Sequence, residues 1–375
     1  MSALDFLADE LAALDAVDRR RRRPDEARDP GLLVLCSNDY LGYATERVIG
    51  VEPSDAALGA AASRLISGEH PEHRALEREM VSWTGYDDAL VFTSGYAANV
   101  GLMSALLRPG DTVVSDALNH ASLIDGMRLS RARVVVAPHN DAAAVEQALV
   151  QAPGEGRRWV VTEGYFSMDG DRPDLGALRA ICDRHGAGLI VDDAHSLGVF
   201  GPEGSGSWAE QGVRPDVLIG TFGKAVGGQG AFVAGPVVLT DWLWNRARSF
   251  VFSTGLSPLL AAVDLAGVRR ARADEAGRAR LRELSARLRR GLRELGYRVV
   301  EDSVGPIVPV LIGAEEDALR MSRALLERGV QVTAIRPPTV PVGSSRLRVT
   351  VHARLPDEAI TRALDAFAAV RREAP

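Results

Sequence analysis

The stretch DVLIGTFGKAVGGQG, residues Asp216 to Gly230, places a lysine just after a short apolar strand. After Asp216 comes the apolar run Val217–Ile219, in which Val217 and Ile219 are β-branched, and this is typical of a strand inside a covered sheet. Lys224 follows the turn, among glycines that have no side chain to cover it. Lysines at the buried end of a strand tend to have lowered pKa values, which suit covalent chemistry with carbonyl compounds. The stretch therefore predicts a reactive amine at the edge of a sheet.

Five other short apolar runs precede this strand and alternate with helical patterns. They are ALVF (89–92), TVVSD (112–116), RVVVA (133–137), RWVVTEG (158–164) and GLIVDD (188–193). Such runs, apolar on both faces, favour an α/β fold with a mainly parallel sheet covered by helices. In these sheets ligands gather at the carboxyl ends of the strands.

The pattern changes toward both ends of the chain. Residues 3–20 are typical of an amphipathic helix that ends at RRRRRP (19–24). After about residue 255 a long helical run precedes further strands and helices. The strands are expected near 298–301, 307–312, 330–335 and 346–352, and the helices near 314–328 and 356–372. We expect an N-terminal helix and extended segment over 1–38, a large α/β domain over 39–257 and a smaller C-terminal α+β domain over 258–375.

The composition limits the class of protein. Of the 375 residues, 46% are hydrophobic and 25% charged, as in ordinary globular proteins. The net charge of −6 gives no overall positive potential that would attract nucleic acid. No apolar run has the length of a membrane helix. Cys36 and Cys182 form neither a disulfide framework nor a metal-ligand spacing. We expect a cytoplasmic protein without a metal, nucleic-acid or membrane partner.

Polar residues follow several of the predicted strands. TSGYAAN (93–99) opens a helix with a Ser-Gly pair, whose free backbone N–H groups suit a phosphate. His120 and Ser167 follow the strands TVVSD and RWVVTEG, and Asp192 and His195 follow GLIV. Taken singly, each has an ordinary structural explanation, such as a helix cap, a loop histidine, a turn serine or a hydrogen-bonded aspartate.

Together with Lys224, these residues form the set that pyridoxal phosphate needs. That cofactor requires an amine for its aldehyde, an anion site, an acid beside its pyridinium nitrogen and a flat partner for its ring. Other cofactors fit less well. A P-loop would need glycine at position 218 and Ser or Thr after the lysine, where the chain has Leu218 and Ala225. No G-x-G-x-x-G follows the first strand, and the histidines lack metal-ligand spacing.

Eight motifs carry a resemblance to a known family. They are SNDYLG (37–42), ASRLISG (62–68), SGYAAN (94–99), NHAS (119–122), EGYFSMDGD (163–171), VDDAHSLG (191–198), TFGKA (221–225) and RLRVT (346–350). In this order they resemble the α-oxoamine synthases, within the fold-type-I pyridoxal-phosphate enzymes. The resemblance implies an aspartate-aminotransferase-like fold, a homodimer with a shared active site, and an acyltransferase that condenses an amino acid with an acyl thioester, releasing CO2 and thiol.

The segment TAIRPPTVPVGSSRLRVT (333–350) is similar to the members that join L-alanine to a pimeloyl thioester in biotin biosynthesis. The resemblance leaves the acyl carrier open between coenzyme A and an acyl-carrier protein. Two alternatives stay open. One is a sister synthase, of the aminoketobutyrate-forming or serine-palmitoyl type, and the other is a non-catalytic, cofactor-binding regulatory module.

The resemblance also implies roles for residues around the cofactor ring. Lys224 would bond to the cofactor and act as the proton-transfer base. Asp192 would pair with the pyridinium nitrogen, and His120 would stack on the ring. His195 and Ser167 would lie near the ring hydroxyl.

The remaining implied roles concern the phosphate and the substrates. For the phosphate they are backbone N–H groups of Gly95 and Tyr96, the hydroxyl of Thr221, and Ser253 and Thr254 reaching from the neighbouring subunit. For the substrates, Arg348 would hold the alanine carboxylate with help from Asn38, and Thr339 would line the acyl pocket. An arginine among Arg19 to Arg23, with Arg21 as our choice, would bind the distal pimeloyl carboxylate.

Overall fold

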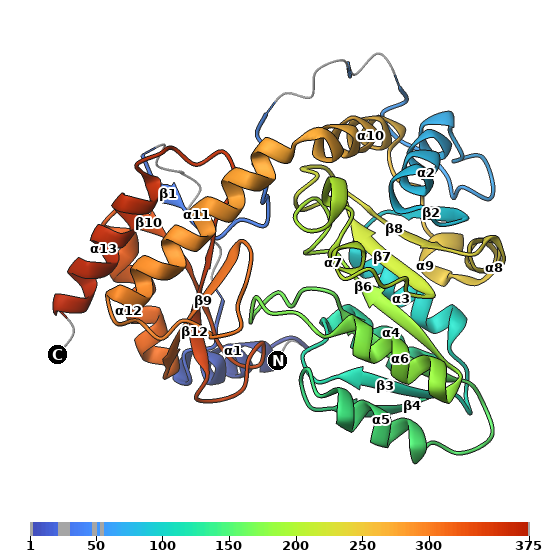
Figure 1. The fold of residues 1–375 in the computed structure, drawn as a ribbon, viewed down its shortest axis with the longest axis horizontal. Coiled ribbons are helices and arrows are strands. Elements are labelled where there is room, and N and C mark those ends of the chain that lie inside the picture. The colour runs from blue at the N-terminus through green and yellow to red at the C-terminus, as the bar shows by residue number, and fades with distance from the viewer. Residues whose placement is uncertain (1–2, 22–30, 47–50, 53–55, 374–375) are drawn as a thin grey trace. The chain divides into compact units, whose positions relative to one another are not determined.

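The structure, a computed structural model, describes residues 3–21, 31–46, 51–52 and 56–373 (Figure 1). Contacts group the chain into two units. One consists of Asn38–Ser167 and Asp171–Arg280, and the other of Met1–Ser37, Met168–Gly170 and Leu281–Pro375. This division falls after Arg280, later than the border expected after residue 257. The expected domain borders stay predictions.

The larger unit is built on a seven-stranded sheet in the order β2-β8-β7-β6-β5-β3-β4. The strands are β2 (Asp88–Phe92), β3 (Thr112–Asp116), β4 (Arg133–Ala137), β5 (Arg158–Glu163), β6 (Ala187–Asp192), β7 (Val217–Thr221) and β8 (Ala231–Gly235). Only β8 is antiparallel to its two neighbours, β2 and β7. The expected α/β fold with a mainly parallel sheet is confirmed, and β8 is a strand that the sequence analysis did not identify.

Helices cover both faces of this sheet, because successive strand residues point to opposite sides. Val113, Val161 and Ile190 belong to one apolar cluster, whereas their chain neighbours Val114, Val160 and Leu189 belong to another. The first cluster contains residues of α3 (Gly95–Leu106), α4 (Ala121–Ser130), α8 (Val237–Arg246) and α9 (Arg248–Val251). The second contains residues of α5 (Ala142–Val150) and α6 (Leu175–His185) and the partly buried Trp208 of α7 (Ser207–Glu210).

The remaining helices of the larger unit are α2 (Pro71–Thr84) and α10 (Pro258–Ala273), which pack together, and the short turn η1 (Pro202–Gly204). The long helical run expected after residue 255 is broken at Asp274, beyond which α11 (Glu275–Glu294) begins. Asp274 accepts a backbone hydrogen bond from Gly277 at 2.8 Å, as a residue at a helix start does.

The smaller unit contains an antiparallel sheet in the order β11 (Thr333–Ile335), β12 (Ser345–Thr350), β9 (Ile307–Gly313). It also has a parallel pair, β1 (Leu33–Val34) with β10 (Val330–Gln331), and the helices α12 (Glu315–Glu327) and α13 (Ala359–Glu373). The strand expected over 330–335 is thus divided into β10 and β11. The strand expected at 298–301 is reduced to one bridge, Val299 to Val310.

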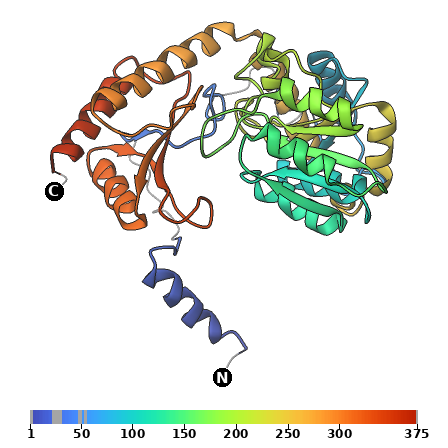
Figure 2. The same ribbon diagram turned by 60° about the horizontal axis from the view of Figure 1, so that its bottom comes forward.

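The N-terminal helix α1 spans Phe6–Ala16 (dark blue in Figure 2). Its apolar stripe is exposed: Leu4, Leu7, Leu11, Leu14 and Val17 each keep at least 40% of their surface in solvent. None of the helices in the described part of the chain is both long and apolar enough to span a membrane.

Candidate active site

A pocket of about 210 Å³ lies where β5, β6 and β7 end and where α3 and α4 begin. Parallel strands bring their carboxyl ends to one edge of a sheet, and this edge is where the predicted residues meet. The pocket is lined by Gly95, Tyr96, Asn99, His120, Ser122, Glu163, Asp192, Ala194, His195, Thr221 and Lys224.

Lys224 lies in the turn after β7, half-buried at the wall of this pocket. It is the only lysine in the 375 residues, and every other basic side chain of fixed charge is an arginine. An arginine does not lose its proton in a protein and cannot act as a nucleophilic amine. The pocket therefore contains the one side-chain amine that the sequence has. This count alone points to Lys224 as the candidate amine.

Asp192 is held by neutral donors. It is the last residue of β6 and only 7% exposed. Asn99 Nδ2 donates to its Oδ2 at 2.7 Å, and the backbone N–H of Ala194 donates to its Oδ1 at 3.0 Å. Neither of these two partners carries a charge, and the carboxylate lines the pocket beside Lys224. Asn99, on α3, is a site residue that the sequence analysis missed.

Glu163 is a second buried carboxyl that the sequence analysis missed. It ends β5 beside Asp192, its register partner on β6, and is 3% exposed. Burial and the neighbouring Asp192 charge raise the pKa of Glu163 to about 8, against opposing effects of Lys224 and the backbone N–H groups of His120 and Ser167. Its Oε1 has no hydrogen-bond partner within the described residues. A largely protonated acid therefore faces the pocket at neutral pH.

His120 caps the first turn of α4 and presents a neutral ring. Its Nδ1 accepts a hydrogen bond from the backbone N–H of Ser122 at 3.2 Å and lies 2.7 Å from the Ser122 hydroxyl. Since Nδ1 accepts, the neutral ring carries its proton on Nε2. Burial lowers the pKa of His120, although the nearby Asp192 carboxylate opposes this effect. An uncharged imidazole is suited to lie flat against an aromatic ring.

His195 is oriented by a tyrosine. Its Nδ1 lies 2.7 Å from the hydroxyl of Tyr40, a fully buried residue of the SNDYLG motif. The same hydroxyl lies 3.4 Å from Asn38 Oδ1. Asn38, expected near the amino-acid substrate, is thus connected to the pocket through Tyr40. The motif pointed to Asn38, but not to Tyr40.

The N-terminus of α3 supplies an anion site. Ser94 caps this helix by accepting from the backbone N–H of Ala97 at 3.1 Å. Gly95 and Tyr96 are the first two helical residues, and their N–H groups have no partner within the helix. Thr221 lies nearby, but its hydroxyl donates to the Gly230 carbonyl at 2.7 Å. Donation from Thr221 to a phosphate therefore requires its hydroxyl to rotate.

Several predicted residues lie outside this pocket. Ser167 contributes its backbone N–H to Glu163, and Ser253 and Thr254 line a different cavity beside Arg64. In the smaller unit, Arg348 lies on β12 with 6% exposure. There Arg21 Nη2 donates to Thr339 Oγ1 at 3.2 Å, so two residues expected at the acyl chain are in contact.

The other N-terminal arginines differ from Arg21 in their partners. Arg19 forms an ion pair with Glu315 at 2.9 Å, and Arg20 with Asp15 at 2.7 Å. Arg22 and Arg23 lie outside the described residues.

The pocket fits pyridoxal phosphate on its own chemistry. It combines an amine, a carboxylate held by neutral donors, an unpartnered acid oxygen and the open N-terminus of a helix. No group of His, Cys, Asp and Glu among the described residues is arranged to hold a metal ion. Fold and pocket together define the class of the fold-type-I pyridoxal-phosphate enzymes.

Comparisons with known proteins agree with this class. The model of the family "Aminotransferase class I and II" matches residues 30–367. An 8-amino-7-oxononanoate synthase of Marinobacter nauticus is 47% identical over 91% of this chain and 87% of its own length. One of Anaeromyxobacter dehalogenans is 45% identical over 100% and 97%.

Solved structures give the same result. A serine palmitoyltransferase of S. paucimobilis has a TM-score of 0.92 at 30% identity, covering 100% of this chain and 99% of its own. An 8-amino-7-oxononanoate synthase of Francisella tularensis has a TM-score of 0.78 at 25% identity, covering 92% and 99%. The chain belongs to the aminotransferase class I and II family and, within it, to the 8-amino-7-oxononanoate synthases. The resemblance expected from the motifs is confirmed.

Proposed function

We propose that this chain is a pyridoxal-phosphate-dependent acyltransferase that condenses L-alanine with a pimeloyl thioester to 8-amino-7-oxononanoate, CO2 and free thiol, a step of biotin biosynthesis. One observation carries the proposal. The only lysine of the chain and the buried carboxylate of Asp192 line one pocket at the N-terminus of α3. The identity to the curated relatives supports the choice of reaction.

Each pocket residue has a separate role in the proposed reaction. Bound pyridoxal phosphate supplies an electron-withdrawing ring that stabilises negative charge on the amino acid. Lys224 holds the cofactor and then moves the proton at the α-carbon. Asp192, held in place by Asn99 and the backbone N–H of Ala194, would pair with the ring nitrogen and favour its protonated form. His120 would cover one face of the ring and keep water from it.

Separate residues would hold the ring hydroxyl and the phosphate of the cofactor. His195, oriented by Tyr40, would lie near the ring hydroxyl, and Ser167, which is outside the pocket lining, would approach it from the loop after β5. Gly95 and Tyr96 donate backbone N–H groups to the phosphate, and the positive end of the α3 dipole favours its charge. Thr221 adds its hydroxyl after rotation.

Four residues are proposed to bind the two substrates. Arg348 binds the alanine carboxylate, which a guanidinium fork suits, and Asn38 assists. Thr339 lines the acyl pocket, and Arg21 binds the distal carboxylate of the pimeloyl chain. The hydrogen bond between Arg21 and Thr339 supports this pairing. The acyl carrier is either coenzyme A or an acyl-carrier protein.

We propose further that the enzyme is a cytoplasmic homodimer whose subunits share their sites. The exposed apolar stripe of α1 supports a partner, as do Tyr96 and Phe252, which are 50% and 73% exposed beside the site segments. In such a dimer Ser253 and Thr254 would reach the phosphate of the neighbouring subunit.

Thiol release tests the proposed substrates. The holoenzyme is assayed with alanine, glycine or serine, each against pimeloyl-CoA, acetyl-CoA and palmitoyl-CoA. Alanine with pimeloyl-CoA is expected to have the highest kcat/KM. Faster turnover of glycine with acetyl-CoA, or of serine with palmitoyl-CoA, would assign the chain to a sister synthase. Cofactor binding without any turnover would favour a regulatory module.

A further inference from the structure

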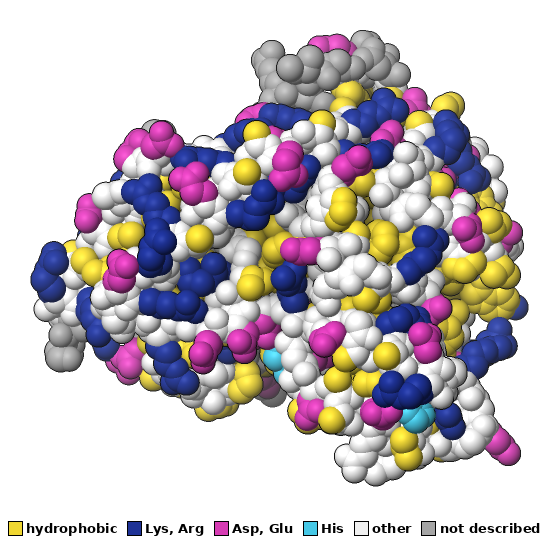
Figure 3. All heavy atoms as spheres, viewed as in Figure 1, with side chains coloured by type: hydrophobic (Ala, Val, Ile, Leu, Met, Phe, Trp, Pro, Cys, Tyr) yellow, Lys and Arg dark blue, Asp and Glu magenta, His cyan; other side chains and the backbone are white. Residues whose placement is uncertain are grey.

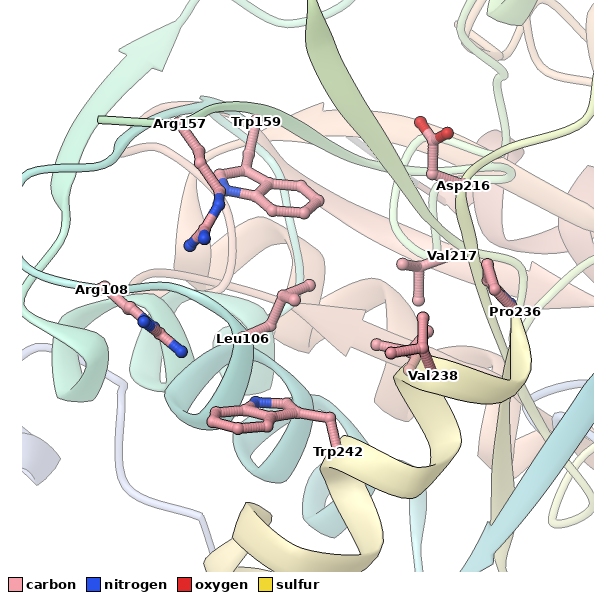
Figure 4. A pocket seen from close by; sticks show the side chains of 10 residues that line it. Leu106, Arg108, Arg157, Trp159, Asp216, Val217, Pro236, Val238 and Trp242 are labelled. Atoms are coloured by element: carbon pink, nitrogen blue, oxygen red, sulfur yellow. The ribbon is translucent and has the colours of Figure 1, made fainter. Parts of the chain in front are cut away.

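A second pocket, of about 300 Å³, lies at the amino ends of β5 and β7 (Figure 4). Trp159 is the second residue of β5 on this side, whereas Glu163, at the other end of the same strand, faces the active site. Four residues of extended strand separate the two positions by roughly 13 Å. The second pocket is therefore separate from the catalytic one.

The walls of this pocket are two indole rings held in place by their neighbours. Trp159 lies over Gly188, where an added Cβ would come within 2.5 Å of the ring. Trp242 Nε1 donates to the Ala105 carbonyl at 2.8 Å. Figure 4 shows the rings on opposite sides of the space, with Leu106 between them. The walls are thus built into the fold.

The two ends of the pocket differ in charge. Arg108 and Arg157 lie at one end, and Val217, Pro236 and Val238 at the other (Figure 4). The guanidinium of Arg108 lies 5.3 Å from the centre of the Trp242 ring. Neither arginine forms an ion pair with a carboxylate in the described parts of the chain.

The Asp216 carboxylate and the Trp159 indole N–H also affect which ligand the pocket can bind. Asp216 also lines the pocket, but its carboxylate is bound by Arg179 and by the backbone N–H of Leu189, both at 2.7 Å. Trp159 Nε1 is buried and lacks a hydrogen-bond partner among the described residues. The pocket therefore offers two unpaired cations, a spare N–H donor and an apolar slot.

We propose that this pocket binds a small amphipathic carboxylate, with its anionic group at Arg108 and Arg157 and its ring or short acyl chain between Trp159 and Trp242. A guanidinium binds a carboxylate through two parallel hydrogen bonds, and indole faces favour flat apolar groups. The volume is at the small end of ligand sites, which suits one ring system or a medium-length chain. Figure 3 shows apolar side chains gathered over α8 and α9, where Val238 is 75% exposed.

The probe for a test is 2-naphthoate, titrated into the holoenzyme by isothermal calorimetry, with the uncharged 2-naphthamide as the matched control. We expect one naphthoate per chain with a Kd below about 1 mM, the range that about 13 non-hydrogen atoms support. The amide should bind at least about tenfold more weakly, because it lacks the charge that the arginines recognise.

Two surface variants locate the probe. Val238→Glu places a negative charge at the apolar end, and R108Q/R157Q removes both cations while keeping hydrogen-bonding side chains. Each should weaken naphthoate binding at least about tenfold. Val150→Glu and Arg133→Gln make the same replacements at exposed positions outside the pocket and should leave it unchanged. The kcat and KM of every variant for the two substrates should equal those of the parent enzyme.

Four results would overturn the proposal. They are no measurable heat with naphthoate, equal binding of the amide, unchanged affinity in both pocket variants, and a change in solution mass caused by Val238→Glu. The last result would mean that a second copy of the chain covers this surface.

Discussion

Replacing His139 by glutamine is expected to destabilise the larger unit most at or below about pH 6.5 and least near pH 10. The imidazole lies between two carboxylates, with Nδ1 2.9 Å from Asp116 Oδ1 and Nε2 2.9 Å from Asp171 Oδ2. Burial alone would lower the pKa of His139, but hydrogen bonds to Asp116 and Asp171 raise it to about 10. The imidazolium therefore joins the ends of β3 and β4 to the loop that carries Ser167.

The magnitude follows from the difference between the folded and unfolded pKa values. A rise from about 6.5 to about 10 corresponds to a ceiling of ~5 kcal/mol in the free energy of unfolding. The His139 side chain is 23% exposed, so solvent screening reduces this, and we expect about 2–3 kcal/mol. Because the folded pKa is the higher one, the stabilisation is complete below about pH 6.5. It is lost as the pH rises toward about 10.

The assay is guanidinium unfolding of both proteins at several values between about pH 6 and pH 10.5. The stability difference between parent and His139→Gln should shrink steadily across this window. His185→Gln is the matched control, since His185 contacts one surface carboxylate, Glu146, at 3.1 Å. A difference that stays constant with pH, or a variant as stable as the parent near pH 7, would refute the reasoning.

Three predictions concern the catalytic site. Asp192→Asn should leave the protein folded but lower kcat by about 10³-fold, which corresponds to ~4 kcal/mol in the activation free energy. A decrease in kcat of less than tenfold would contradict the role assigned to Asp192. Glu163→Gln should abolish an inflection near pH 8 in the pH profile of kcat and in that of the bound cofactor's absorbance. If the inflection persists in the variant, another group titrates there. Arg348→Ala should raise the KM for alanine by about 10- to 100-fold with little change in the KM for the acyl thioester. Equal increases in the two KM values would contradict a specific contact between Arg348 and the alanine carboxylate.

Much of the fold is readable from local patterns, but β8 is not. The strands of the larger sheet that the sequence predicts are continuous apolar runs, and a covered parallel sheet requires such runs. AFVAG (231–235) is short, contains Ala and Gly, and follows directly after a glycine-rich turn. Its strand conformation depends on β2 and β7, which pair with it on both sides. β7 precedes β8 in a hairpin, but β2 is far away in the sequence, and pairing with β2 leaves no local signal.

Some site residues can be predicted from local sequence patterns, and others depend on tertiary packing. Asp192 and Lys224 were predicted because they follow apolar strands directly. Glu163 has the same position at the end of β5, so the rule applied to it could have found it. Asn99 and Tyr40 hold Asp192 and His195 from α3 and from the SNDYLG segment, and their contacts depend on tertiary packing. A single sequence does not reveal which turn of a helix faces a strand end.

The most direct test of the account is to find which amine holds the cofactor. Borohydride reduction of the yellow holoenzyme, followed by proteolysis and mass spectrometry, should place one phosphopyridoxyl group on the peptide that contains Lys224. Because no other residue of the sequence provides a side-chain amine, Lys224→Ala should be colourless after dialysis and take up no label. A yellow, labelled Lys224→Ala protein, or a label confined to the terminal amine of the parent, would contradict the central claim.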